Sequence, residues 1–492
     1  MISLNRLLAG LCEPLDLDIE IERISMDSRE MQTAGLFIAS AKQSAMRQQH
    51  VDQAVNAGAK AIVIDDSHSV ETTVPVLKIA ELDQKISLLG DRFYGQPSKS
   101  MTVIAVTGTN GKTSVSQFIA QSLESLATPC GVIGTLGQGR INQLQDTGMT
   151  TPSPLQLQRV LAEMQQQGIK HVVLEASSHA LEQGRLNAVD INIAVFTNLS
   201  RDHLDYHGDM ASYAAAKQRL FTFASVNTAI FNIDDNYGQQ FYAQPKSHIS
   251  HVSYSQTQTA DWQASGLHCD NEGLHFDLTG QTKTTHINSP LLGRFNVDNL
   301  LATAAVLSAL DYQSAVIAKC LTAVKPVTGR MQLLREQNSP SVVVDYAHTP
   351  DAIAQALTAM RQHLNQSAAL WCVFGCGGDR DTGKRPLMGE QAEQHADRLV
   401  LTDDNPRSES SENIIEAILS GLQKPESALV KTDRREAIFY AVAEAANDDM
   451  ILVAGKGHET YQEKQGQKQP FNDIAVVMEA QAARQQQAGV NL

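Results

Sequence analysis

A glycine-rich loop between an apolar strand and an amphipathic helix is the feature that most constrains this chain. The segment MTVIAVTGTNGKTSVSQFIAQSLESL, residues 101–126, has this order. Glycines let backbone N–H groups face a phosphate, the start of a helix favours negative charge, and lysine and threonine can contact phosphates and Mg²⁺. Val106 stands where the standard G-x-x-x-x-G-K-[ST] pattern has its first glycine. The segment predicts nucleotide binding, with an ordinary glycine-rich turn as the alternative.

Strands alternate with helices along most of the remaining chain. Apolar runs HVVLEAS, INIAVFTN and TAIFN follow the loop, and SVVVDYA, ALWCVFG, DRLVLTD and DMILVAG follow residue 333. This pattern predicts an α/β fold with largely parallel sheets and ligands at the strand ends. The polar stretch at 240–290 is expected to be irregular or β. We predict three domains: a small N-terminal α/β domain at 1–97, a central domain of P-loop type at 98–332, and a doubly wound, Rossmann-like domain at 333–492.

Charge and composition exclude several classes of function. The net charge of −15 disfavours nucleic-acid binding, which requires a basic face. No apolar run approaches the roughly 20 residues of a membrane helix, and the N-terminal segment lacks the pattern of an export signal. The six cysteines are scattered and are expected to be reduced thiols, with no CxxC pair to suggest zinc. We therefore expect a cytoplasmic monomer that acts on small molecules.

Two polar residues at predicted strand ends could hold a metal beside the loop. Glu175 ends the strand in VVLEASSHALEQGR, and His203 is placed at the end of another in FTNLSRDHLDYHGD. Each alone is more simply explained as a solvated glutamate and as a surface or capping histidine. Together with the GKT sequence they are typical of Mg²⁺ ligands beside nucleotide phosphates.

Lys217 falls on the apolar side of a predicted helix. In DMASYAAAKQRLFTFA the stripe at helical spacing contains Met210, Tyr213, Ala214, Lys217, Leu220 and Phe221. An unpaired lysine in such a stripe should be desolvated, which favours its neutral amine. The alternative is a lysine whose stem covers apolar surface while its ammonium reaches water.

The shortened loop G-T-N-G-K-[TS] resembles the signature of the Mur ligase family and its folylpolyglutamate synthetase relatives, which are ATP-dependent amide-forming enzymes. LLGRFNVDNLLAT, VTGRM and DYAHTPD resemble further motifs of that family, in the same order. The resemblance implies an ATP site formed by Gly108, Thr109, Asn110, Gly111, Lys112, Thr113, Ser114, Asn296, Asn299, Arg330 and Asp345. It also implies a CO₂-derived carbamate on Lys217 that binds Mg²⁺ together with Thr113, Glu175 and His203. Lys112, Glu175, His203 and Lys217 are then the expected catalytic residues.

Within that family, TTPSP and SSHALEQGR resemble the members that add the third residue of the peptidoglycan stem peptide. The resemblance implies UDP-N-acetylmuramoyl-L-alanyl-D-glutamate as a substrate, bound by Ser28, Thr150, Thr151, Ser177, Gln183 and Arg185. Hydroxyls and an arginine suit its carboxylates and sugar oxygens. The stretch AKQSAMRQQHVDQAV departs from the family pattern, so it does not indicate which residues contact the uridine.

The segment LTDDNPRSES follows a predicted strand and precedes a predicted helix. Asp, Asn, Pro and Ser are the residues that turn a chain and cap a helix, which is one interpretation. The other is a site with carboxylate acceptors and guanidinium donors, whose ligand has an ammonium and a carboxylate at its distal end. Meso-diaminopimelate has both groups, and lysine has only the ammonium. The resemblance implies that this amino acid is bound by Arg380, Asp404, Asn405, Pro406, Arg407, Gly455 and Glu459.

Two other functions remain open from the sequence. A folylpolyglutamate synthetase shares the loop and the lysine but should lack the DNPR sequence and the N-terminal domain. A regulatory protein that uses ATP as a switch would bind the nucleotide without turnover that depends on an acid and an amine. Glu175, His203 and Lys217 argue against that second alternative.

Overall fold

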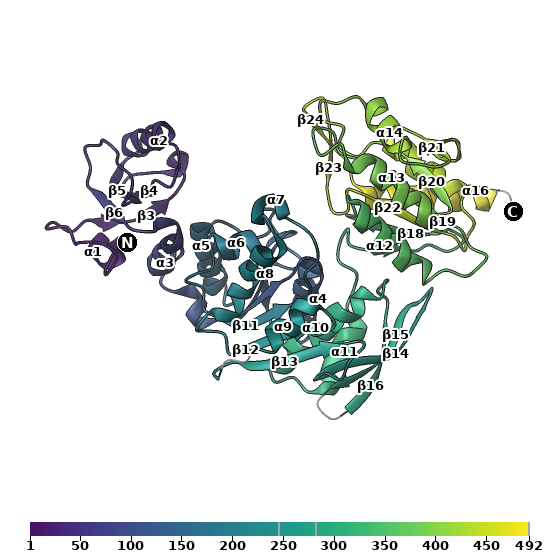
Figure 1. Ribbon diagram of the computed structural model, residues 1–492, viewed down its shortest axis with the longest axis horizontal. Helices are drawn as coiled ribbons and strands as arrows, with labels where there is room; N and C mark the ends of the chain where they lie inside the picture. Colours follow the sequence, from purple (N-terminus) through teal and green to yellow (C-terminus); the bar gives the residue numbers. More distant parts are fainter. Residues whose placement is uncertain (245–246, 281–282, 491–492) are drawn as a thin grey trace. The chain divides into compact units, whose positions relative to one another are not determined.

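A computed structural model describes residues 1–244, 247–280 and 283–490 (Figure 1). The chain divides into two compact units. The first unit contains Met1–Tyr254 and Ala305–Asp311, and the second contains Ser255–Ala304 and the chain from Tyr312 onward.

A four-stranded parallel sheet with helices on both faces forms the N-terminal part of the first unit. Alternate side chains of its strands belong to two different cores. Leu36 and Val63 pack with the helices at 4–7 and 82–93, whereas Phe37 and Ile62 pack with the helix at 44–56. This alternation is expected for strands that are covered on both sides. The strands are β3 (Arg23–Ser25), β4 (Gly35–Ile38), β5 (Ala59–Asp65) and β6 (Val76–Ile79), and the helices are α1 (Leu4–Leu7), η1 (Ser28–Glu30), α2 (Ser44–Asn56), α3 (Leu82–Phe93) and η2 (Pro97–Ser100). The short β1 (Ile2–Ser3) and β2 (Glu20–Ile21) pair antiparallel beside them.

A larger parallel sheet in the order β13-β12-β11-β7-β10-β8 follows, with β9 antiparallel to β8 at its edge. Its strands are β7 (Thr102–Thr107), β8 (Cys130–Gly134), β9 (Gly137–Arg140), β10 (His171–Glu175), β11 (Ile191–Phe196), β12 (Thr228–Asn232) and β13 (Ser250–Ser255). Its helices are α4 (Lys112–Ser125), α5 (Pro154–Gln166), α6 (Ser178–Glu182), α7 (Leu204–His207), α8 (Met210–Gln218), η3 (Arg219–Thr222) and α9 (Asn236–Tyr242).

The central strands of this sheet end side by side. Glu175 is opposite Val106, and Phe196 is opposite Thr107. The loops after β7, β10 and β11 therefore leave the sheet at one edge, where ligands of open α/β sheets bind.

In the polar stretch at 240–290, the described residues after α9 are largely β structure, one of the two expected forms, and residues 245–246 and 281–282 lie outside the described part of the chain. Besides β13 the stretch forms an antiparallel meander of β14 (Trp262–Asp270), β15 (Gly273–Gly280) and β16 (Lys283–Ser289). Alternate residues of β15 are buried, including Leu274, Phe276 and Leu278, which is the pattern of a sheet with one covered face. Helices α10 (Phe295–Ala309) and α11 (Ser314–Ala323) follow.

The C-terminal part of the second unit is a sheet in the order β17-β18-β22-β19-β20-β21, parallel except for β17. Its strands are β17 (Gln332–Leu334), β18 (Ser341–Asp345), β19 (Leu370–Phe374), β20 (Arg398–Leu401), β21 (Leu429–Val430) and β22 (Met450–Ala454). Its helices are α12 (Pro350–Arg361), α13 (Lys384–His395), α14 (Ser411–Leu419), η4 (Pro425–Ser427), α15 (Arg434–Glu444) and α16 (Asp473–Val490). A hairpin of β23 (Tyr461–Lys464) and β24 (Gln467–Pro470) follows β22.

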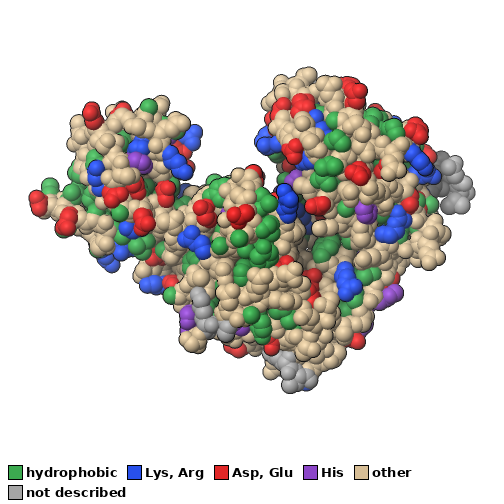
Figure 2. All heavy atoms as spheres, in the orientation of Figure 1, with side chains coloured by type: hydrophobic (Ala, Val, Ile, Leu, Met, Phe, Trp, Pro, Cys, Tyr) green, Lys and Arg blue, Asp and Glu red, His purple; other side chains and the backbone are tan. Residues whose placement is uncertain are grey.

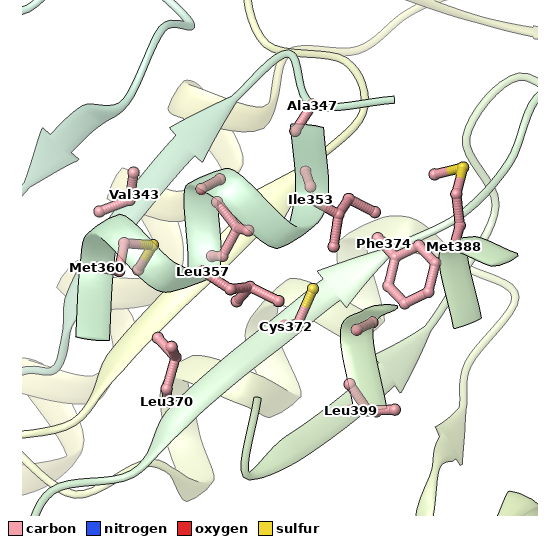
Figure 3. Packing of buried hydrophobic residues seen from close by; sticks show 14 of the residues in the cluster. Val343, Ala347, Ile353, Leu357, Met360, Leu370, Cys372, Phe374, Met388 and Leu399 are labelled. Atoms are coloured by element: carbon pink, nitrogen blue, oxygen red, sulfur yellow. The ribbon is translucent and has the colours of Figure 1, made fainter. Parts of the chain in front are cut away.

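Two cores cover the two faces of this sheet. Figure 3 shows one of them, in which Ile353 and Leu357 of α12 pack against Cys372 and Phe374 of β19. Alternate strand residues such as Val373 and Val453 face the other core, with Ile438 of α15 and Val477 of α16. The doubly wound arrangement predicted for this region is confirmed, and it brings the loops after β18, β19, β20 and β22 to one edge.

Charged side chains and cysteines are distributed as the sequence led us to expect. Acidic and basic side chains are interspersed over the face shown in Figure 2. All six cysteines are free. Among the described residues, no helix combines the length and apolar content that a membrane crossing requires.

Candidate active site

The phosphate loop turns sharply between β7 and α4. Gly108 has φ +153°, and a Cβ there would lie 1.9 Å from Oγ1 of Thr197. Gly111, at φ +84°, is the N-cap of α4. Only glycine fits the first position, and only glycine adopts the second at no steric cost. The glycine-rich segment thus forms a loop between a strand and a helix, as the sequence predicted. The first turn of α4 contains no acidic side chain that would repel a phosphate.

Neighbouring strand ends hold this loop in place. The Asn110 backbone N–H donates to Oδ1 of Asn198 at 2.9 Å, and the Thr197 hydroxyl donates to the Asn110 carbonyl at 2.6 Å. Lys112 lies back over the loop, where its Nζ donates to the carbonyls of Gly108 and Thr109 at 2.8 Å each. The first turn of a helix presents backbone N–H groups that no residue of the helix accepts, so the start of α4 fits a phosphate group.

Glu175 is buried at the end of β10 and faces the first turn of α4. The Thr113 hydroxyl donates to Oε2 of Glu175 at 3.0 Å. Thr135 donates its backbone N–H to Oε1 and its hydroxyl to Oε2, each at 3.0 Å. A carboxylate and a hydroxyl beside a phosphate loop fit Mg²⁺, which takes few protein ligands and keeps several waters. Thr135 was not predicted, although it follows the strand β8 in the sequence as Glu175 ends β10.

Lys217 is a fully buried lysine in the first unit. It is 1% exposed and its Nζ donates to the Gly108 carbonyl at 2.8 Å. Its Nζ also lies 4.4 Å from the centre of the Tyr213 ring. Burial and the positive charge of Lys112 lower the pKa of Lys217 well below its usual value, against a smaller opposite effect of Asp202. The prediction that Lys217 is buried is confirmed, and its lowered pKa favours the neutral amine over an ammonium that reaches water.

The prediction that His203 ends a strand is wrong. β11 ends at Phe196, and His203 is the exposed N-cap of the short α7, with φ +54°. Its ring centre is 6.1 Å from that of Tyr213, the residue that covers Lys217. Over residues 1–244, 247–280 and 283–490 no three His, Cys, Asp or Glu side chains are grouped so that they could hold a metal. A metal here would rely on Thr113, Glu175 and a further ligand.

The residues predicted for the UDP-muramoyl dipeptide lie together around the start of α6, with one exception. The Thr151 hydroxyl lies 3.1 Å from that of Ser177, which caps α6. Arg185 donates to the Thr151 carbonyl at 2.7 Å and through Nη2 to Oε1 of Gln183 at 2.6 Å. The Thr150 hydroxyl is 3.1 Å from that of Thr135, which links this group to the surroundings of Glu175.

Ser28 belongs to a different part of the first unit. It begins η1 in the N-terminal sheet domain, where its hydroxyl donates to Oε1 of Gln53 at 2.8 Å. In the divergent stretch that follows β4, the buried Arg47 donates to the carbonyls of Ala41 and Lys42 at 3.1 Å each. Arg47 therefore holds this stretch in place through its hydrogen bonds to the backbone.

The other residues predicted for ATP lie in the second unit. Asn296 and Asn299 are buried on α10 and joined by a 2.9 Å hydrogen bond. The Asp345 carboxylate accepts the backbone N–H groups of Met331 and Ala347, and burial raises its pKa above the usual value. Arg330 packs 4.7 Å above the Tyr346 ring, and its buried Nε has no hydrogen-bond partner among the described residues. An unpartnered buried donor is a reason to expect a ligand, because leaving it unpaired is costly.

The residues predicted for the amino acid come from the loops after β19, β20 and β22. Asn405 donates from Nδ2 to Oε2 of Glu459 at 3.0 Å. A Cβ at Gly455, whose φ is +116°, would lie 2.4 Å from Oδ2 of Asp404. Burial raises the pKa of Asp404, although the charges of Arg434 and Lys456 oppose this. A Cβ at Gly378 would lie 1.9 Å from the Pro406 carbonyl, so the DNPR loop, residues 404–407, packs directly on a glycine.

Arg407 is held in an unusual conformation by the hairpin. Its φ is +53°, a region that non-glycine residues rarely adopt. Its N–H donates to the Glu463 carbonyl at 3.0 Å, and its carbonyl accepts from Gln465 at 2.6 Å. Its Nη1 donates to the Gly378 carbonyl at 2.6 Å, and a Cβ at Gly377 would lie 3.0 Å from the same Nη1 and 3.6 Å from Cγ of Arg380. Such strain persists only where the surroundings impose it, and it often marks a functional position.

Two buried cations beneath these loops were not predicted. Arg434 forms a fully buried ion pair with Asp473 at 2.8 Å and donates to the carbonyls of Asp403 and Ala454. It thereby joins the ends of β20 and β22. Lys456 is 0% exposed and donates to Asn405 and Glu459. No local signal distinguishes either residue, because their partners lie 20 or more positions away in the sequence or across a loop.

The whole chain is similar to proteins of one family. Residues 106–307 match the model of the Mur ligase middle domain, and residues 329–457 match that of the Mur ligase glutamate ligase domain. A UDP-N-acetylmuramoyl-L-alanyl-D-glutamate--2,6-diaminopimelate ligase of Xanthomonas campestris pv. campestris (strain 8004) is 46% identical over 484 residues, 97% of each chain. The protein of the same name from Coxiella burnetii is 44% identical over 479 residues, 96% of this chain and 98% of that one.

A solved structure of a ligase with that name is also similar, with a TM-score of 0.75 and 37% identity over 98% of this chain and 99% of that one. The resemblance seen in the motifs, the fold class and the prediction of a ligase are therefore confirmed. This chain belongs to the Mur ligase family.

Proposed function

We propose that this protein is an ATP-dependent ligase that joins meso-2,6-diaminopimelate to the D-glutamate γ-carboxylate of UDP-N-acetylmuramoyl-L-alanyl-D-glutamate, in peptidoglycan synthesis. The relatives at 44–46% identity carry the two substrates in their names. The observation that supports the choice of amino acid is the strained Arg407 in the same loop as Asn405, which bonds Glu459. A guanidinium and a carboxylate match a ligand end with a carboxylate and an ammonium, and lysine lacks the carboxylate that the guanidinium would bind.

Lys112 acts first in the proposed reaction. ATP phosphates replace the Gly108 and Thr109 carbonyls as its acceptors, and its charge stabilises the phosphoryl group during transfer. The γ-carboxylate of D-glutamate attacks the γ-phosphorus and ADP leaves, which forms an acyl phosphate. The amine of diaminopimelate attacks the acyl carbon, loses a proton and expels phosphate. Mg²⁺, when held by Thr113, Glu175 and His203, would neutralise part of the phosphate charge.

Lys217 is proposed to carry a carbamate. A neutral amine is the form that reacts with CO₂, and the burial of Lys217 beside Lys112 favours that form. The product is an additional carboxylate next to Gly108, which would complete the ligands that Thr113 and Glu175 begin.

The remaining assignments follow the sequence predictions. Asn296, Asn299, Arg330 and Asp345 are proposed to contact ATP, and Ser28, Thr150, Thr151, Ser177, Gln183 and Arg185 the UDP-muramoyl dipeptide. Arg380, Asp404, Asn405, Pro406, Arg407, Gly455 and Glu459 are proposed to contact the amino acid. We further propose domains at 1–97, 98–332 and 333–492 and a cytoplasmic monomer; the two family matches, at 106–307 and 329–457, support the last two divisions.

Phosphate release tests the proposal directly. The enzyme is incubated with Mg²⁺, ATP and UDP-N-acetylmuramoyl-L-alanyl-D-glutamate, and either meso-diaminopimelate or L-lysine is added. Release that requires the dipeptide and is much faster with diaminopimelate supports the proposal. Release with a folate and glutamate instead would favour a folylpolyglutamate synthetase, and ATP binding without acceptor-dependent release would favour a switch protein.

A further inference from the structure

Lys456 is a fully buried cation behind the proposed amino-acid site. It follows Gly455 in the loop after β22, and its side chain is 0% exposed. Its Nζ donates to Oδ1 of Asn405 at 3.0 Å and to Oε2 of Glu459 at 2.8 Å. A buried ammonium costs several kcal/mol unless its partners compensate for the lost water. Both of its hydrogen-bonded partners are residues that we assign to diaminopimelate.

The contacts of Lys456 decide which way the Asn405 amide points. Oδ1 of Asn405 accepts from Lys456 and, at 2.9 Å, from the backbone N–H of Glu463. Nδ2 donates to Glu459 at 3.0 Å. Two donors therefore fix the oxygen on the inner side, and one hydrogen of Nδ2 remains for a ligand. Asn405 can offer the amino acid a donor and not an acceptor, which suits a carboxylate.

The same contacts orient Glu459. Its Oε2 accepts from both Lys456 and Asn405, so Oε1 remains for a ligand ammonium. Burial raises the pKa of Glu459, but the hydrogen bond and charge of Lys456, the hydrogen bond from Asn405 and the charge of His458 together bring the pKa below its usual value. The carboxylate is thereby kept ionised as the acceptor that an ammonium needs.

We infer that Lys456 is a positioning residue for amino-acid selection: through its two hydrogen bonds it makes Asn405 a donor and Glu459 an acceptor toward the distal end of the amino acid. This inference rests on the proposed function. Without the ammonium, the Asn405 amide can turn and present its oxygen to the ligand carboxylate, which repels it. Glu459 also loses the charge that keeps it ionised.

The test is the kinetics of the full-length Lys456→Met variant, which keeps the side-chain length and removes the ammonium. We expect the KM for meso-diaminopimelate to rise roughly tenfold or more, by the loss of hydrogen bonds to charged groups. The KM values for ATP and for the dipeptide should stay within about twofold, since neither is assigned to these residues. The matched control is Lys468→Met, because Lys468 also lies over the Tyr461 ring, at 4.2 Å against 5.7 Å for Lys456, but it is exposed. The control should behave as wild type.

A double-mutant cycle separates positioning from a general structural role. If Lys456 acts through Asn405, then Lys456→Met should add little to the KM for diaminopimelate once Asn405→Ala is present. With Arg380→Ala, which is not in contact with Lys456, the two effects should multiply.

The outcomes distinguish this inference from the proposed function. A wild-type enzyme that does not use diaminopimelate overturns both. A wild-type enzyme that does, with an unchanged KM in Lys456→Met, overturns only the role of Lys456. A variant that loses affinity for ATP and diaminopimelate alike, or multiplicative effects with Asn405→Ala, would mean that the lysine only supports the fold.

Discussion

Lys217 and Lys456 are both buried against loops that follow parallel strands, but the charges around them differ. Lys217 donates to the Gly108 carbonyl, and among the described residues no carboxylate forms an ion pair with it. Burial lowers its pKa, and the positive charge of Lys112 lowers it further, against a smaller opposite effect of Asp202. Lys456 instead has the Glu459 carboxylate 2.8 Å from its Nζ. A buried lysine without a counter-ion becomes a neutral amine, and one with a counter-ion holds its partners in place.

The difference in their surroundings suits the two lysines to different roles, a reaction for Lys217 and ligand recognition for Lys456. In our proposal the Lys217 amine in the first unit is neutral and reacts with CO₂. The ion-paired Lys456 in the second unit donates to Asn405 and Glu459, and we infer that it orients them. In our proposals the same residue type thus serves phosphoryl transfer in one unit and the choice of amino acid in the other.

The largest expected effect on activity comes from removing Lys112, the cation beside Lys217. Lys112→Ala should reduce ATP turnover by about 10³-fold or more, because the phosphoryl group loses a preorganised cation. Phosphate release with all substrates present measures this. Lys468→Met serves as the control for removing a lysine. A rate near that of wild type would show that residues 108–114 do not bind the phosphates.

The second-largest expected effect on activity comes from removing the Lys217 amine. Lys217→Ala should lower ligation at least about 100-fold, as expected for a lost metal ligand. Small carboxylates such as formate or acetate should restore part of the rate, since they can replace the carbamate. Circular dichroism should show an unchanged fold. Full activity without added carboxylate would contradict the carbamate proposal.

Substitutions in the proposed amino-acid site should have a smaller effect, limited to the KM for the amino acid. Arg407→Ala should raise the KM for meso-diaminopimelate roughly 10- to 100-fold, the effect of removing a charged hydrogen-bond donor. The KM for ATP should change little. Steady-state kinetics with each substrate varied in turn measures both. Equal increases for the two substrates would place Arg407 outside amino-acid recognition.

The smallest expected effect is on stability and depends on pH. Because the pKa of Lys217 is lowered well below its usual value in the folded chain, the unfolded chain binds one more proton. The free energy of unfolding should therefore rise with pH between the lowered pKa and the ordinary lysine pKa of about 10.4, by at most ~1.4 kcal/mol per pH unit. Lys217→Met should flatten this rise in denaturant titrations without CO₂, whereas Lys468→Met should not. Identical slopes for wild type and Lys217→Met would show that Lys217 titrates normally.

Local patterns in the sequence predicted the first of the two regions well. The strand, the glycine-rich loop and the helical stripe that buries Lys217 depend on neighbours within about two helical turns. His203 was misplaced because the chain runs on irregularly from Phe196 to α7, and periodicity does not specify such a path. Thr135 was missed because its contact with Glu175 joins strands 40 positions apart in the sequence.

The second region was predicted in part. In TDDNPRSES, the structural interpretation holds for Asp403 and Ser410: Asp403 accepts from the Ser411 hydroxyl, and Ser410 caps α14. Asp404, Asn405 and Arg407 instead face the loops after β19 and β22. Lys456 could not be identified, because a lysine in a Gly-Lys-Gly loop is ordinarily exposed and its burial depends on β20 and the hairpin.

The contrast between the two lysines is tested most directly by ¹³C NMR of the protein equilibrated with ¹³C-bicarbonate. We predict a carbamate resonance in the wild type that is absent in Lys217→Met and retained in Lys456→Met. No carbamate signal in the wild type, or a signal that persists in Lys217→Met and disappears in Lys456→Met, would contradict the account.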